Sequence, residues 1–145
     1  MGYKFRLEPV LKLNIMDVNK SVNQLKEKEH FYKVEQTELD KLTKELDNIG
    51  NRTGSDAFTL RNEMLYKDSL RERIEVQNEN VNLASQKVNL AHSALMKAQV
   101  KKKSVEKLKE REIEDYRANL AHNERLELDE LATIRHNYTS ILGGY

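Results

Sequence analysis

The chain has 145 residues and a formal net charge of +1, with 38% hydrophobic, 34% charged and 6% aromatic residues. Charged residues exceed the roughly 25% that is usual for soluble domains, so a wide globular core is excluded. One proline and five glycines are too few for a disordered linker, and the lack of cysteine excludes disulfides and thiolate metal sites. No apolar run reaches the roughly 18 residues of a membrane span. We therefore expect a long all-α protein of the cytoplasm, since the first residues also lack the apolar stretch of a signal peptide.

The positions of proline and glycine divide the chain into two helical segments. Pro9, the only proline, suits the first turn of a helix, and no further glycine or proline precedes Gly50. Gly50 and Gly54 then mark a turn in which Thr53 or Ser55 can cap the next helix. The pattern predicts a single elongated domain over residues 1–145, with helix 1 at about 9–49, a turn at 50–55 and helix 2 at about 56–138.

Apolar residues recur three and four positions apart along both segments, as the seam of a coiled coil requires. In the first segment the expected seam is Leu11, Ile15, Val18, Val22, Leu25, Glu29, Tyr32, Gln36, Leu39, Thr43 and Leu46. In the second segment it is Leu70, Ile74, Gln77, Val81, Ala84, Val88, Ala91, Leu95 and Ala98. The two segments are expected to form an antiparallel coiled-coil hairpin whose second helix overhangs the first.

The turn also predicts which residues face each other and where the pairing ends. Folding the chain about residues 50–55 places Leu39 near Tyr66 and Leu11 near Leu95, so the first helix is used up at about residue 97. Residues 101–138 would then have no partner in their own chain, although they carry Val105, Leu108, Ile113, Tyr116, Leu120, Leu126, Leu128, Leu131 and Ile134. The pattern favours a helix that is offered to another protein, and the alternative is a self-associating helix.

Residue patterns that carry chemistry are scarce. The spacing of Glu27 and His30 occurs once, whereas a di-iron bundle needs two such motifs, and no phosphate-binding glycine loop is present. We expect no enzyme activity, no metal and no cofactor. The basic residues from Lys101 to Arg111 are interleaved with Glu106 and Glu110 and followed by Glu112 and Glu114, which favours ion pairs along a solvated helix over nucleic-acid binding.

Motifs near both ends of the chain resemble those of the FliJ family. The sequence FRLEPVL at residues 5–11 is similar to the opening of that family, which often reads F-x-L-x-P-V-L. Residues 107–111 and 124–132, with the element LDELA, resemble its closing pattern, and residues 86–91 also look family-like. The resemblance spans nearly the whole length.

The resemblance implies a component of the flagellar type III export apparatus that looks like the central stalk of rotary ATPases. Such a protein inserts into the hexameric ring of the export ATPase FliI, promotes its assembly, links it to the export gate protein FlhA and handles export chaperones. It implies a chain that is a monomer when free and reaches the cytoplasmic face of the membrane, at the flagellar base, through its partners only. The alternatives are the equivalent stalk of a virulence secretion system and a structural self-associating coiled coil.

The resemblance also implies which residues make these contacts. The ATPase-binding residues would be Phe5, Leu7, Leu11, Leu108, Arg111, Tyr116, Arg125, Leu128, Asp129, Glu130 and Leu131. The gate-binding residues would be Leu42, Ile49, Tyr66 and Leu70. Ile49 and Tyr66 are favoured because they are expected beside the seam, and the alternative for all four is that they close the core of the hairpin.

Overall fold

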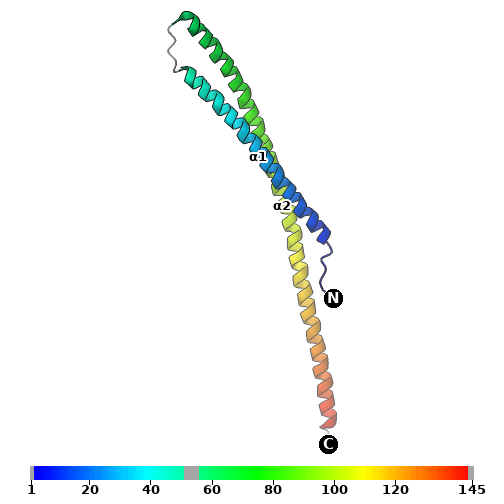
Figure 1. Cartoon of the computed structure of the whole chain (residues 1–145). Helices are drawn as coiled ribbons and strands as arrows, with labels where there is room; N and C mark the ends of the chain where they lie inside the picture. The colour runs from blue at the N-terminus through cyan, green and yellow to red at the C-terminus, as the bar shows by residue number, and fades with distance from the viewer. Residues whose placement is uncertain (1, 51–55, 144–145) are drawn as a thin grey trace. The chain divides into compact units, whose positions relative to one another are not determined.

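The computed structural model describes residues 2–50 and 56–143, and two α-helices make up most of this part of the chain (Figure 1). Helix α1 spans Glu8–Gly50 and helix α2 spans Ala57–Leu142, with 43 and 86 residues. The prediction of an all-α antiparallel hairpin whose second helix is the longer one is confirmed. The expected caps Thr53 and Ser55 lie outside the described residues.

The chain divides into two compact units. The hairpin unit is Ile15–Val100 and contains most of α1 with the first half of α2. The terminal unit combines Met1–Asn14 with Lys101–Tyr145. The single-domain organisation of the chain stays a prediction.

Contacts within the hairpin unit establish the antiparallel direction. Tyr66 donates a hydrogen bond to Glu45, and Gln77 donates one to the backbone carbonyl of Glu35 over 2.9 Å. The Lys87 ammonium lies 5.9 Å from the centre of the Phe31 ring. As the residue number rises along α2, the residue number of its partner on α1 falls, so the two helices run in opposite directions, as Figure 1 shows for this unit.

The seam of α1 agrees with the expected one at seven of its eleven positions. From Leu11 onward, the described residues that are buried or half-buried are Leu11, Asn14, Val18, Ser21, Val22, Leu25, Lys28, Tyr32, Glu35, Leu39, Leu42, Leu46 and Ile49. The expected seam residues Ile15, Glu29, Gln36 and Thr43 are exposed, and their neighbours Asn14, Lys28, Glu35 and Leu42 are half-buried instead. The seam therefore mostly steps by three and then four from Leu11, where the sequence analysis stepped by four and then three.

The seam of α2 is confirmed throughout the hairpin unit. All nine predicted residues from Leu70 to Ala98 are buried or half-buried. Leu70 has no exposed surface at all, and Ala84 and Val81 are nearly as well covered. On α2 the apolar and small residues follow a single pattern of three and four residues, so only one stripe is possible. On α1 the apolar residues fit two such patterns, one that includes Asn14 and one that includes Ile15.

The expected register between the helices is wrong. The sequence analysis placed Tyr66 near Leu39, but Tyr66 contacts Glu45, which lies six residues further along α1. Knobs-into-holes packing allows only registers in which the seam layers of both helices coincide. The expected register came only from folding the chain symmetrically about residues 50–55, and such folding takes no account of which seam layers of the two helices coincide.

Polar residues within the seam are hydrogen-bonded. The Gln77 side chain is 8% exposed, and its amide nitrogen donates to both the carbonyl and the carboxylate of Glu35. The Gln77 amide oxygen accepts a 3.4 Å bond from Asn80. A buried amide without such partners would cost about 1–3 kcal/mol, so these bonds make a polar layer tolerable at one register and unfavourable at others.

We expect the substitution Leu70→Ala to lower the free energy of unfolding by about 2–5 kcal/mol, because it leaves a cavity at a fully buried position. Leu65→Ala is the matched control, because Leu65 lies on the same helix and is 60% exposed, and it should change the stability by less than about 0.5 kcal/mol. Urea unfolding followed by circular dichroism measures both. Equal effects of the two substitutions would contradict the assigned seam.

Candidate partner-binding surface

The terminal unit begins with a short non-helical segment that leads into α1. Residues 3–5 have no regular structure, and the backbone amide of Glu8 donates to the carbonyl of Phe5 over 3.2 Å. The first helical bond joins the Leu11 amide to the Leu7 carbonyl, at 2.9 Å. Pro9 lies in this first turn, where its missing amide hydrogen leaves no intrahelical bond unmade.

This segment lies against α2 and corrects the expectation that residue 101 begins an unpartnered helix. The Tyr3 hydroxyl donates to the Glu112 carboxylate over 3.0 Å, and its ring centre lies 5.5 Å from that of Tyr116. The Glu8 carboxylate accepts a 2.9 Å bond from the Lys109 ammonium, which also stands over the Phe5 ring at 5.8 Å.

The stripe that the segment covers continues the spacing of a seam. The half-buried residues of α2 in this unit are Lys102, Val105, Glu106, Lys109, Glu112 and Ile113. Lys102 and Lys109 are therefore seam residues with acidic partners, since Lys102 also lies 3.7 Å from Glu106. The sequence analysis ended the pairing of the helices at about residue 97, because it did not expect Glu8 to lie opposite Lys109.

Every described residue of α2 from Glu114 onward is exposed, and among these Tyr116 still contacts Tyr3 of the segment. One face of this overhang carries apolar residues three or four positions apart, in two groups separated by Glu124 and Glu127. These residues are Ile113, Tyr116, Leu120, Leu131, Ile134, Tyr138, Ile141 and Leu142. We call this set the apolar stripe of the overhang; side chains at such spacing share one helix face.

The structure places the expected ATPase-binding residues in two environments. Phe5 and Leu11 are 7% and 6% exposed and Leu7 is half-buried, so these three are covered in the free chain, and their contact with an ATPase stays a prediction. They are covered because the N-terminal segment and the first turn of α1 pack against α2 of the same chain. The others are exposed, namely Leu108, Arg111, Tyr116, Arg125, Leu128, Asp129, Glu130 and Leu131.

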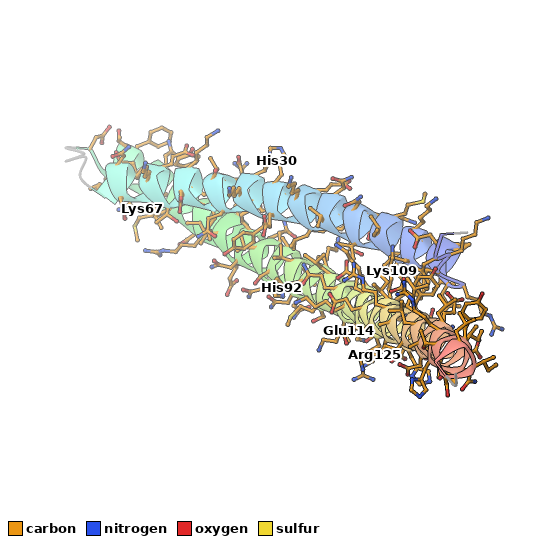
Figure 2. All side chains as sticks on the ribbon, turned by 90° about the horizontal axis from the view of Figure 1, so that it is seen from below. His30, Lys67, His92, Lys109, Glu114 and Arg125 are labelled. Atoms are coloured by element: carbon orange, nitrogen blue, oxygen red, sulfur yellow. The ribbon has the colours of Figure 1, made fainter. Side chains whose placement is uncertain are left out.

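The exposed members of that set do not share one face of the helix. Tyr116 and Leu131 belong to the apolar stripe, whereas Arg125 and Asp129, four residues apart, lie on another side of α2. Figure 2 shows Arg125 and Glu114 projecting outward from the helix. The sequence analysis missed Tyr138, Ile141 and Leu142, because it ended the helix near residue 138. These residues continue the spacing of three and four that relates Leu131 to Ile134, and this spacing could have placed them on the same helix face.

The expected gate-binding residues are mostly interior. Leu70 is fully buried, Ile49 is 5% exposed and Leu42 is half-buried, so Ile49 lies on the seam and not beside it. Tyr66 is exposed and donates a hydrogen bond to Glu45. Of the four, only Tyr66 offers a side chain to another molecule without opening of the hairpin.

The described residues contain no group of three or more histidine, aspartate or glutamate side chains placed to hold a metal ion. His30 and His92 are both exposed, and in Figure 2 they lie on different helices of the hairpin unit. Within the described ranges, no helix is both long enough and apolar enough to cross a membrane. The surface features that remain are the apolar stripe and its flanking charges.

Comparison with known proteins gives one family and one similar structure. The family model described as the flagellar FliJ protein matches residues 3–139 of this chain. The solved structure of a YscO homolog, CT670 of Chlamydia trachomatis, is similar with a TM-score of 0.77 and 23% sequence identity. That similarity covers 96% of this chain and 98% of the other, and it concerns the fold. No curated protein sequence matches the chain.

Partial burial, the hydrogen bond to Glu112 and the nearby carboxylates raise the pKa of Tyr3 above its ordinary value of 10.0. Because the neutral phenol is favoured, its stabilising contribution is complete below pH 10 and is lost as the pH rises through the raised pKa. Subtracting the ultraviolet titration of Tyr3→Phe from that of the wild type isolates this group, and its midpoint should lie above 10.0. In denaturant the midpoint should return to the ordinary value. A midpoint at or below 10.0 in the folded chain would contradict the contact.

Proposed function

Because the chain belongs to the FliJ family, we propose that it acts as a stalk of the flagellar type III export apparatus. In this role the overhang of α2 enters the ring of the export ATPase FliI and promotes its assembly and activity. The chain supplies no catalytic group. Its contribution is a rigid helix that presents the apolar stripe to the ring.

The observation that carries the proposal is the exposed part of the apolar stripe, which continues past the N-terminal segment. Leu131, Ile134 and Tyr138 are each more than 60% exposed within one helix face. A contiguous apolar face of this kind marks an interaction site more often than an ordinary surface does. A long, mostly uncovered helix is also marginal unless another surface packs on it.

The proposal extends to the other expected partners. Tyr66, near the end of the hairpin at which α2 begins, is the residue that we assign to the export gate protein FlhA. Export chaperones are the third class of partner. These contacts would bring the chain to the cytoplasmic face of the membrane at the flagellar base, without a membrane segment of its own.

The test measures binding to purified FliI and stimulation of its ATPase activity. The double variant L131D/I134D places two charges on the stripe, and a charge buried against an apolar surface is unfavourable. We expect its affinity for FliI to fall at least about tenfold, equivalent to ~1.4 kcal/mol, with loss of stimulation. Leu90→Asp is the matched control, because Leu90 is an exposed leucine of the same helix in the hairpin unit, and it should bind normally.

A third variant separates the two faces of the overhang. Leu128 is as exposed as Leu131 but lies at the edge of the stripe, on the side toward Arg125 and Asp129. Loss of binding in Leu128→Asp with normal binding in L131D/I134D would move the contact to the face that carries Arg125 and Asp129. Normal binding in all three variants would refute the proposal. Helicity from circular dichroism shows that each variant is folded.

The competing function is a structural coiled coil that self-associates through the overhang. A stalk should be a monomer when free, whereas the self-associating coil should show a larger mass in dilute solution that L131D/I134D reduces to that of a monomer. Analytical ultracentrifugation of both proteins distinguishes the two functions. An equivalent stalk of a virulence secretion system would fail to stimulate FliI but would stimulate the ATPase of that system.

A further inference from the structure

The N-terminal segment holds α2 through exposed polar contacts and one buried ring. The Glu8–Lys109 ion pair leaves about a third of each side chain in solvent, and the Tyr3–Glu112 bond is only part-buried. Contacts of this exposure each contribute little, because water competes for both partners. Phe5 is the exception, since its ring is buried beneath Lys109. Residues 3–7 are therefore fastened at few points, and we call them the strap.

The strap lacks the backbone bonds that would make it part of α1. Only the Glu8-to-Phe5 and Leu11-to-Leu7 bonds join residues 3–7 to the helix that follows. Lys4 and Arg6 are exposed, so alternate side chains of the strap face solvent. Releasing the strap breaks its side-chain contacts and these two backbone bonds, and it leaves the remaining turns of α1 in place.

The surface beneath the strap is the beginning of the apolar stripe. Tyr3 lies on Tyr116 and hydrogen-bonds Glu112, next to Ile113, and the same helix face continues uncovered to Leu120. A helix that docks along the stripe and extends toward Ile113 meets the ring of Tyr3. The strap and the docking helix cannot occupy Tyr116 at the same time.

We propose that the strap is a displaceable cover that competes with the docking partner for the part of α2 from Lys109 to Tyr116. The partner this surface fits is an amphipathic helix with apolar side chains for Ile113 and Tyr116, which repeats the chemistry of Phe5 and Tyr3, while Glu8 of α1 keeps its ion pair with Lys109. The inference rests on the proposed function, because the partner is taken to be the ATPase. It adds that binding is opposed in the free chain and is completed by release of the strap.

Two engineered states of the full chain test the competition with purified FliI as the probe. Y3A/F5A removes both rings and releases the strap. Y3C/E112C, joined by a flexible bismaleimide linker, fastens it, and the chain has no native cysteine that could react. The controls are Val10→Ala, an exposed truncation in the first turns of α1, and the Y3C/E112C protein without the linker.

We expect the released variant to bind FliI about fivefold more tightly, because the apparent affinity falls with the fraction of chains that is competent to bind. The linked protein should bind at least about fivefold more weakly than the same protein without the linker. Trypsin cleavage after Lys4 and Arg6 of the wild type gives a second measurement that needs no substitution. It should become faster when FliI is bound, since the strap is then free.

The outcomes separate the strap from the proposed function. Equal binding by the wild-type, released and linked proteins, with unchanged cleavage, overturns the strap and leaves the stalk function standing. Binding by none of them refutes the stalk function, and the strap as its competitor falls with it. Binding by the released variant alone supports both. Weaker binding by the released variant would instead make Tyr3 and Phe5 part of the docking surface and would overturn the competition.

Discussion

A helix stripe of apolar side chains is stable only where another surface covers it, and this constraint governs the whole chain. Within the hairpin unit α1 covers α2 from Leu70 to Ala98, and both helices are buried along one seam. Within the terminal unit residues 3–14 cover the next part of α2, as far as Tyr116. From Leu120 to Leu142 the described chain supplies no cover, and this exposed face is the site that we propose for a partner.

Polar residues on the seam show how this cover is made specific. Gln77 is buried but has hydrogen bonds to Glu35 and Asn80, and Lys109 is held by Glu8 and Phe5. A purely apolar seam could slide by whole turns at little cost. A buried amide or ammonium loses its partners when it slides, so these layers favour one alignment over its neighbours.

The strap covers the start of the apolar stripe, so the proposed control of partner binding and the proposed binding site use the same surface. Tyr3 and Phe5 provide aromatic cover of the kind that a partner helix would provide, but they are held by partly exposed contacts. A weak intramolecular cover protects an apolar surface from nonspecific association and still yields to a partner that buries more area. In the free chain the strap therefore partly covers the start of the apolar stripe of the overhang.

The sequence by itself determined the secondary structure, the seam of α2 and the presence of an uncovered overhang. Glycine and proline placement and seven-residue spacing are local properties, and on α2 only one stripe satisfied them. The tertiary structure decided which of two stripes on α1 forms the seam, which residue of α1 Tyr66 meets, and that Tyr3, Phe5 and Glu8 cover Lys109 and Glu112. These features depend on which side chains meet across two helices or across a hundred residues of chain, and a pattern read along one segment carries no information about its partner. Ile15 is as apolar as a seam requires, and only the packing of the folded chain showed that Asn14 is half-buried in its place.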